Sequence, residues 1–298
     1  MLADQLRKYG FQVDFMDPPK IPIKNLKNPS FVISSTISSF FKGRYDIVHA
    51  FNVPSAFAMR AARAKKRVLS IHGVFSDQVN ALHSSVLGSV AGATEERVLK
   101  WADRLTTDSK ASQKIYRKKL GLDFEYLPSP IDASKFADLP DVIKKENQIA
   151  YVGRDSYEKG IDILRQIEPQ IHGKVVYCTD LPWKEAMTVL KSSSIVVIPS
   201  RMESLPTIIK EAFYLKIPVI ATDVGGIPEL VQDKITGILV PPEDHAALLK
   251  EVNGLLENKK FAAQLADTAY DFVVKNMTWD VMITQYVRFY EDLLQSDQ

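Results

Sequence analysis

The stretch IVVIPSRMESLPTIIKEAFYLKIPVIATDVGGIPELVQDKITGILV, residues 195–240, decides the fold. Its first apolar run, 195–198, is short and stops at a proline, which predicts a buried strand. Pro206 then stands where a helix can begin, because the N–H of a first-turn residue has no intrahelical partner. A second apolar run, 219–221, leads through two glycines into another helix start. Two such turns place two helix N-termini at one rim of a parallel sheet, where doubly wound folds bind ligands and anions are attracted.

Strands and helices are expected to alternate along the whole chain. In the first half, strands are predicted at 11–17, 46–50, 68–71, 104–107 and 124–127. In the second half, they are predicted around Ile149, Val175, Val196, Val219 and Ile238. Helices are predicted at 2–9, 55–64, 95–102 and 109–120, a surface loop at 18–30 with a helix from there to Phe41, and a linker at 128–145. Such alternation favours an α/β fold in which parallel sheets carry helices on both faces.

Length and composition narrow the class of protein. A chain of 298 residues favours two domains, and 46% apolar with 25% charged residues is typical of a globular protein. The single cysteine, Cys178, allows no internal disulfide and favours a reducing compartment. No apolar run approaches the roughly 18 residues that span a bilayer, and the start MLADQLRKYG lacks the apolar segment of a signal peptide. We therefore expect a cytoplasmic protein.

The two halves of the chain carry opposite charge. Residues 1–145 hold 23 Lys and Arg against 14 Asp and Glu, whereas residues 146–298 hold 15 against 22. The basic clusters lie at 24–27, 60–67 and 117–119. They indicate either an anionic partner, such as a lipid-linked phosphate or the inner face of an anionic membrane, or ordinary solvated helix ends. Nucleic acid is disfavoured because aromatic residues do not interleave with the basic runs.

Two motifs resemble a known family. Glu203 and Glu211 are separated by seven residues, and the sequence from the second is EAFYLKIPVIATDVGGIPELV. This resembles the E-x7-E motif and its continuation in retaining glycosyltransferases of the GT-B fold, in glycosyltransferase family 4 (group 1). Upstream, YVGR at 151–154 and EKG at 158–160 resemble that family's donor-phosphate loop. The two motifs, in this order, make a specific match.

The resemblance extends over most of the chain. YDIVHAFN at 45–52 and LSIHGVF at 69–75 resemble segments of the family's first domain, and NMTWDVMITQYVRFYEDLL at 276–294 resembles its last helices. The family begins with a strand and a glycine-rich turn that contacts the acceptor, followed by the helix that 2–9 resembles. The expectation is therefore a GT-B protein that lacks this first strand and glycine-rich loop.

The resemblance implies a domain organisation. The GT-B fold has two Rossmann-like, doubly wound parallel-sheet domains that face a cleft. Residues 1–133 would form the acceptor-side domain with an incomplete start, and 134–276 the domain that binds the nucleotide sugar. Residues 277–298 would form a C-terminal helix that returns to the first domain.

The resemblance also implies roles for individual residues. Arg154 and Lys159 would hold the two donor phosphates, because fixed positive charge stabilises a departing nucleoside diphosphate. Glu211 would accept hydrogen bonds from the ribose, Glu203 would face the donor sugar, and His72 would lie on the acceptor side. The expected catalytic residues are His72, Arg154, Lys159 and Glu203, and the expected donor-binding residues are Gly153, Arg154, Lys159, Glu203, Leu205, Thr207, Ile208 and Glu211.

The implied function is transfer of a hexose from a nucleotide-diphosphate sugar, with retention of configuration, to a lipid-linked, glycan or small-molecule acceptor. The nucleotide sugar is a co-substrate; no cofactor or metal is expected, and no metal-ligand spacing is present. A protein that binds nucleotide sugars without efficient transfer is the alternative. A hydride-transferring enzyme is disfavoured, because no G-x-G-x-x-G follows a predicted strand. In the alternative without a donor site, Glu203 and Glu211 are ordinary surface carboxylates, and Arg154 and Lys159 are solvent-exposed charges of a loop.

Overall fold

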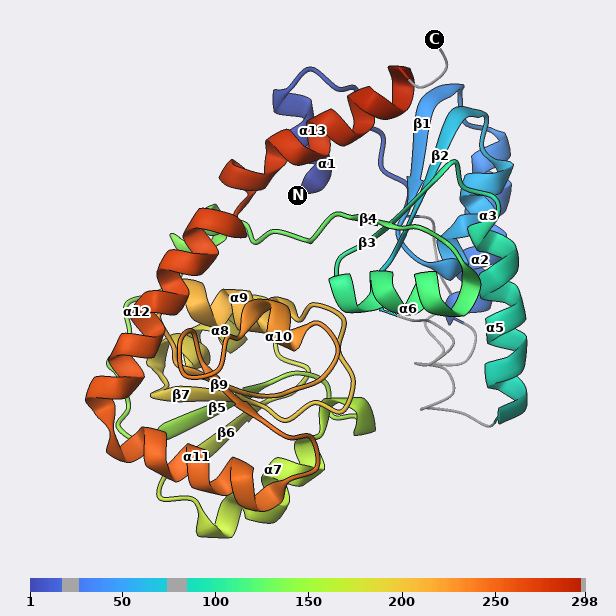
Figure 1. Cartoon of the computed structure of the whole chain (residues 1–298). Helices are drawn as coiled ribbons and strands as arrows, with labels where there is room; N and C mark the ends of the chain where they lie inside the picture. The colour runs from blue at the N-terminus through green and yellow to red at the C-terminus, as the bar shows by residue number, and fades with distance from the viewer. Residues whose placement is uncertain (18–26, 74–84, 296–298) are drawn as a thin grey trace. The chain divides into compact units, whose positions relative to one another are not determined.

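A computed structural model describes residues 1–17, 27–73 and 85–295, and the chain divides into two compact units (Figure 1). Unit 1 comprises Met1–Pro128 and Ile283–Gln298, and unit 2 comprises Ser129–Met282. The expected borders, 133/134 and 276/277, lie a few residues from these. Ile131 explains the difference, because its N–H donates to Met277 O (2.8 Å) and its carbonyl accepts from Trp279 N–H (3.1 Å). These bonds hold both segments in which the chain passes from one unit to the other within unit 2.

Unit 1 contains a four-stranded parallel sheet in the order β1-β2-β3-β4. Its strands are β1 Tyr45–Ala50, β2 Ala64–Ile71, β3 Arg104–Thr107 and β4 Glu125–Tyr126. Its helices are α1 Leu2–Lys8, α2 Lys27–Phe40, α3 Val53–Ala61, α5 Ser85–Leu99 and α6 Lys110–Leu120, joined by the part of α13 (Trp279–Gln295) from Ile283 onward. The predicted capped helix at 109–120 is confirmed as α6: Ser109 Oγ accepts from Ser112 N–H, and the helix ends at Gly121, which has φ +65°.

The predicted strand at 11–17 is wrong. Phe11 N–H donates to Leu6 O (3.3 Å), and Arg7 Nη2 donates to Val13 O (2.6 Å), so the segment folds back along α1 without joining a sheet. Phe15, one of the alternating apolar residues, is 77% exposed. The predicted loop at 18–30 overlaps the start of α2, and 18–26 lies outside the described residues. The helix expected at 95–102 begins ten residues earlier, at Ser85, and ends at Leu99.

A polar network connects α13 to the sheet of unit 1. His49 of β1 places Nδ1 2.7 Å from Tyr290 Oη and Nε2 2.6 Å from Ser70 Oγ, and Ser70 bonds to Thr106. The ring of Phe51 stacks on His49 with centroids 4.1 Å apart. Burial of the imidazole, and secondarily the nearby His72, lowers the pKa of His49 to about 3. The network therefore holds a neutral histidine between three strands and a helix.

Unit 2 contains a five-stranded parallel sheet in the order β6-β5-β7-β8-β9. The strands are β5 Gln148–Val152, β6 Lys174–Cys178, β7 Ile195–Ile198, β8 Val219–Thr222 and β9 Ile238–Val240, which confirms the predicted strands of the second half. The helices are α7 Ile161–Ile167, α8 Trp183–Ser192, α9 Thr207–Tyr214, α10 Ile227–Leu230, α11 His245–Glu257 and α12 Lys259–Asn276, with short 3-10 turns η1 Ala133–Phe136, η2 Tyr157–Lys159 and η3 Glu168–Gln170.

Both faces of this sheet are buried, and β7 shows how. Val196 and Ile198 join a core shared with α8, α9 and α12, whereas Ile195 and Val197 join a second core shared with α7 and α11. Successive strand residues point to opposite faces, so a continuous apolar run serves both cores. Figure 1 shows α8 and α9 on one side of the sheet and α7 and α11 on the other. The α/β prediction of parallel sheets with flanking helices is confirmed.

Among the helices within the described ranges, none is both long and apolar enough to cross a bilayer.

The His49 network predicts a pH dependence of stability. The unfolded chain binds a proton at His49 below about pH 6.5, whereas the folded chain resists protonation until about pH 3. The free energy of unfolding should therefore fall as pH falls below 6.5, with His49 contributing up to about 1.4 kcal/mol per pH unit. Urea unfolding of His49→Gln between pH 7.5 and 5 should show a shallower loss than the wild type.

The matched control is His172→Gln, which changes an exposed histidine of unit 2. It leaves the His49 network intact, so the contribution of His49 to the loss of stability should remain. Equal slopes for the wild type and His49→Gln would contradict a buried neutral His49.

Candidate functional site

The sheet of unit 2 has a switch point between β5 and β7. From β5 the chain moves to β6 on one side, and then returns to β7 on the other side of β5. Ligands of open α/β sheets bind at the carboxyl ends of the strands at such a point. The two motifs begin there, because Gly153 follows β5 and the loop to Glu203 follows β7.

The loop after β5 is folded onto the end of β7. Gly160 has φ +63°, and a Cβ there would lie 1.9 Å from Pro199 O. Only glycine permits this backbone approach. The carbonyl of Glu158 then accepts from the N–H groups of Arg201 (2.9 Å) and Met202 (3.3 Å). These contacts fix the loop that carries Arg154 and Lys159.

The structure brings Lys159 and Glu203 together. Lys159 Nζ lies 2.8 Å from Glu203 Oε1, and Ser200 Oγ donates to the same oxygen at 2.8 Å. The side chain of Glu203 is only 8% exposed. An ammonium and a hydroxyl thus hold the same oxygen of this carboxylate, which satisfies its hydrogen bonding where water has little access.

Arg154 lies at the outer side of the same loop. Its side chain is 70% exposed, and its Nη2 forms an ion pair with Glu158 Oε1 at 2.8 Å. The backbone carbonyl of Arg154 accepts from Tyr151 Oη (2.8 Å), and Gly153 N–H donates to Cys178 O (3.2 Å). The loop backbone is thus anchored to β5 and β6, while the guanidinium extends toward solvent.

Arg201 is a residue of this site that the sequence analysis did not select. Its guanidinium makes two 2.7 Å bonds to Asp162, bonds to Glu243, and donates to Tyr157 O at 2.8 Å. It also lies over the Tyr157 ring, 4.1 Å from the centroid. Bidentate hydrogen bonds and ring stacking hold a guanidinium firmly in one position. Arg201 therefore links its own loop after β7 to η2 and to the loop after β9. Its position two residues before Glu203 was the available signal.

The first turn of α9 holds two of the predicted donor-binding residues, Thr207 and Ile208, and a third, Leu205, lies in the loop before it. Pro206 is the N-cap and no side chain caps the helix, so the amides of Thr207 and Ile208 begin an N-terminus suited to an anion. Thr207 is exposed and Ile208 half-buried, whereas Leu205 is buried and anchors the loop. Further along the helix, Ile209, Ala212 and Phe213 are buried in the core, and Ile208 packs against that core from the half-buried side.

Glu211 lies one turn further along α9. Its Oε1 accepts from Trp183 Nε1–H at 2.7 Å. Burial raises the pKa of Glu211, while the Trp183 hydrogen bond and the charges of Lys210 and Lys135 oppose that rise. Trp183 is a second residue that the sequence analysis did not select; a tryptophan at a helix start, directly after Pro182, was the only signal.

His72 is the one predicted site residue in unit 1. It follows β2, and its Nδ1 lies 2.9 Å from Oδ2 of Asp108, a buried carboxylate at the end of β3. The ring of Phe51 is parallel to that of His72, with an interplanar angle of 8° and centroids 6.4 Å apart. Asp108 and Phe51 therefore fix the orientation of the imidazole.

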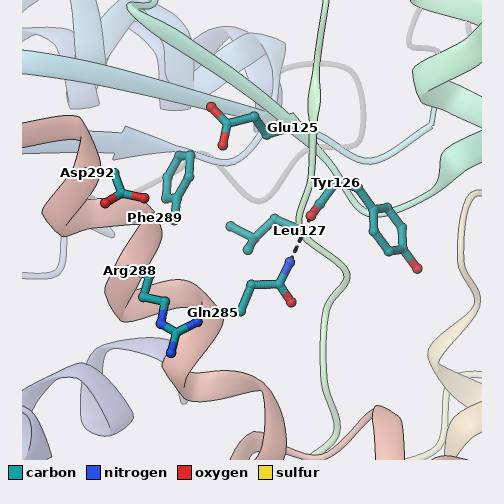
Figure 2. A pocket seen from close by; sticks show the side chains of 7 residues that line it. All are labelled: Glu125, Tyr126, Leu127, Gln285, Arg288, Phe289 and Asp292. Carbon is teal, nitrogen blue, oxygen red and sulfur yellow. Dashed lines mark hydrogen bonds between the residues drawn. The ribbon is translucent and has the colours of Figure 1, made fainter. Parts of the chain in front are cut away.

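A cavity of about 280 Å³ lies elsewhere in unit 1 (Figure 2). Its lining residues are Glu125, Tyr126, Leu127, Gln285, Arg288, Phe289 and Asp292. Gln285 Nε2 donates to Tyr126 O at 3.1 Å, which links α13 to β4 at its edge. None of the predicted site residues lines it. Within the described ranges, no group of three or more His, Cys, Asp or Glu side chains is placed to hold a metal ion.

Two sequence families match the chain. Residues 2–135 match the family described as Glycosyltransferase Family 4, and residues 168–272 match Glycosyl transferases group 1. Together these ranges cover most of both units.

Two curated relatives that match most of the chain are named as glycosyltransferases. The putative teichuronic acid biosynthesis glycosyltransferase TuaC of Bacillus subtilis is 28% identical over 261 residues, covering 76% of this chain and 66% of TuaC. The uncharacterized glycosyltransferase MJ1607 of Methanocaldococcus jannaschii is 24% identical over 294 residues, covering 83% of this chain and 75% of that protein. The chain thus spans about two thirds of the first relative's length.

Solved structures share the fold. Sucrose-phosphate synthase of Thermosynechococcus elongatus superposes with a TM-score of 0.79 at 19% identity, covering 99% of this chain and 92% of the other. HepE of Anabaena, solved in complex with UDP-glucose, has a TM-score of 0.71 at 17% identity, covering 97% and 88%. With both family matches spanning most of its length and this fold likeness, the chain belongs to the GT-B glycosyltransferases of family 4, group 1.

Proposed function

We propose that the chain is a retaining glycosyltransferase that takes a hexose from a nucleotide-diphosphate sugar bound in unit 2. The observation that carries the proposal is the meeting of Lys159 and Glu203 at the switch point of the sheet, beside the uncapped start of α9. HepE was solved with UDP-glucose, and a Staphylococcus aureus TarM variant with UDP, which supports a nucleotide sugar as donor.

The proposed role of the cations follows from the charge that develops. When the bond between the sugar's anomeric carbon and the phosphate oxygen breaks, negative charge grows on the departing diphosphate. Lys159 and the exposed Arg154 stand in one loop, and the N–H groups at the start of α9 add a positive dipole end. Charge-assisted bonds from these groups stabilise the leaving group in the transition state. No metal or cofactor is part of the proposed reaction.

Glu203 and Glu211 take different parts of the donor. Glu203, held by Lys159 and Ser200, faces the sugar and accepts from its hydroxyls. Glu211 accepts from the ribose hydroxyls, which compensates for the burial that raises its pKa. The residues around them, Gly153, Leu205, Thr207 and Ile208, contribute backbone and packing to the same subsite.

On the acceptor side we propose His72. The buried Asp108 accepts from the Nδ1–H of His72, which orients the ring toward a hydroxyl of the acceptor. The acceptor is a growing glycan, lipid-linked or free. TuaC carries the name of a teichuronic acid biosynthesis enzyme, and a further relative, 27% identical over 170 residues, is the O-antigen chain mannosyltransferase C of Escherichia coli. The basic charge of residues 1–145 suits an acceptor that carries phosphate or carboxylate.

We further propose that unit 1 contacts an anionic membrane surface from the cytoplasmic side. Apolar side chains with exposed fractions of 54–86% follow one face of α2 and its end: Ile33, Ile37, Phe40 and Phe41. The exposed Lys42 and Arg44 come directly after them. The opposite face buries Ser35 and Ser39, so the apolar stripe is turned away from the unit's interior. An apolar face with flanking cations fits the headgroup boundary of an anionic bilayer.

The donor proposal predicts metal-independent nucleotide binding. Calorimetric titration with UDP, ADP and GDP should show one of them binding to the chain with the same affinity before and after treatment with EDTA. Radiolabelled nucleotide sugar should then be turned over, to an acceptor or to water. Affinity abolished by the chelator would contradict the metal-free mechanism, and tight binding without turnover would favour a binding protein.

A second prediction concerns Glu211→Gln. Loss of the charged bonds to the ribose should weaken nucleotide binding by about 1.5–3 kcal/mol, roughly 10- to 150-fold in Kd. Because burial raises the pKa of Glu211, the ionised carboxylate costs stability at neutral pH, so the unliganded melting temperature should not fall. Calorimetry and thermal melting measure the two effects.

The control is Glu257→Gln, an exposed carboxylate of α11 on the opposite face of the sheet. It should change neither quantity. A large fall in unliganded melting temperature with unchanged nucleotide affinity would show that Glu211 is structural.

A third prediction tests the membrane contact with Ile37→Ser. Sedimentation with vesicles of phosphatidylcholine and phosphatidylglycerol should show wild-type binding that weakens with salt, and roughly tenfold weaker binding of the variant. Ile235→Ser, which alters an equally exposed isoleucine of unit 2, is the matched control. Equal binding by both variants, or no preference for anionic vesicles, would overturn the proposed contact.

A further inference from the structure

Trp183 connects two helices at the proposed nucleoside subsite. It is the first residue of α8, and its Nε1–H donates to Glu211 Oε1 of α9 at 2.7 Å. Both helices cover the same face of the sheet, where their buried residues share one core. The hydrogen bond joins positions 28 residues apart, so it depends on the packing of α8 against α9.

The indole ring is itself held in place. Phe136 of η1 meets it edge to face, with ring centroids 5.3 Å apart, and Lys135 Nζ lies 5.8 Å from the ring centroid. Phe136 also packs on Tyr214 at the end of α9, at 4.7 Å. Trp183 nevertheless remains 36% exposed, so part of it borders solvent beside Glu211. A side chain that is fixed by packing on several sides and exposed on another is suited to line a ligand-binding site.

The carboxylate of Glu211 needs support to remain charged. Burial disfavours its ionised form and raises its pKa, and three groups act in the opposite direction. Trp183 is the strongest of these, followed by Lys210 on the same helix and Lys135 on η1. Lys210 is fully buried and donates to Ser129 O at 2.5 Å. Trp183 is thus the direct hydrogen-bond donor among them, and an indole N–H donates at every pH.

We propose that Trp183 is a positioning residue of the nucleoside subsite, whose indole N–H holds one oxygen of Glu211 so that the remaining lone pairs of the carboxylate receive the ribose hydroxyls. The inference rests on the proposed function of Glu211. A carboxylate offers about four acceptor positions, and the indole uses one of them. Trp183 therefore fixes the rotamer and the charge of Glu211 while leaving capacity for a nucleotide.

The test is a double-mutant cycle on nucleotide affinity. The probes are UDP, ADP and GDP, titrated into the full chain by calorimetry at pH 7.5. Trp183→Phe should weaken binding by about five- to tenfold, because the phenyl ring keeps the aromatic packing and lacks the N–H that binds Glu211. In the Glu211→Gln background the same change should cost less than about twofold, because the group on which Trp183 acts is already altered. A tryptophan that only stacks on the base would cost the same in both backgrounds.

The pH dependence of nucleotide affinity is a second readout. It would not change if Trp183 contributed packing alone. Without the indole bond, Glu211 should protonate at higher pH, so the affinity of Trp183→Phe relative to wild type should fall further from pH 7.5 to pH 5.5. The nucleotide's own phosphate titration is common to all proteins and cancels in this ratio. Carbon-13 NMR of the labelled carboxylate should show the same upward shift of the Glu211 pKa in the unliganded variant.

Trp101→Phe, a tryptophan of unit 1 that meets Phe57 edge to face, is the matched control and should match wild type throughout. A wild-type chain that binds none of the three nucleotides would overturn the proposed function, and the subsite with it. A wild-type chain that binds one of them, with equal costs of Trp183→Phe in both backgrounds or an unchanged Glu211 pKa, would overturn the role of Trp183 alone.

Discussion

The ion pair between Lys159 and Glu203 depends on two close backbone approaches. Gly160 brings the loop after β5 against Pro199 O, and Gly225, with φ +54°, brings the loop after β8 against Glu203 O. A Cβ at either glycine would lie 1.9 Å from the carbonyl oxygen that it faces. Three loops therefore meet with no side chain between their backbones, and the ion pair forms at their junction. Because β5, β7 and β8 are neighbouring buried strands, the bases of these loops are fixed by the sheet.

The sequence allowed most of the fold to be predicted because its signals are local. The β7 run needs only apolar residues between breaks, and the strand predicted at 104–107 matches β3 residue for residue. The segment 11–17 has the same local signal and forms no strand, since a strand also needs a neighbour to bond with. There, Arg7 binds the carbonyl of Val13, and the chain turns back on α1. The start of α5 at Ser85 was not predictable from the apolar pattern, whereas the capping residue Ser109 correctly marked the start of α6.

The candidate site likewise contains residues that could be selected from the sequence and residues that could not. The resemblance of two motifs selected Lys159, Glu203 and Glu211 as candidates without knowledge of the fold, and the structure brings the first two together. Their partners were not predictable, because Trp183 reaches Glu211 across 28 residues and Arg201 reaches Glu243 across 42. Such contacts arise when helices and loops pack, and the single-sequence pattern contains no record of them. The residues with proposed roles in binding and transfer can thus be selected from the sequence. Their hydrogen-bond and ion-pair partners, such as Trp183, are found only in the structure.

The charged side chains proposed to bind the donor already have protein partners: Arg154 with Glu158, Lys159 with Glu203, and Glu211 with Trp183. Isolated charges in a half-buried site would carry a large desolvation penalty, and these pairs reduce it. Under the proposed function, donor binding would be an exchange, in which diphosphate oxygens replace the carboxylates as partners of the cations or share the cations with them. Its affinity is the difference between two sets of charged bonds. After the proposed transfer, the same carboxylates would compete with the diphosphate for Arg154 and Lys159, so the ion pairs would also favour release of the product.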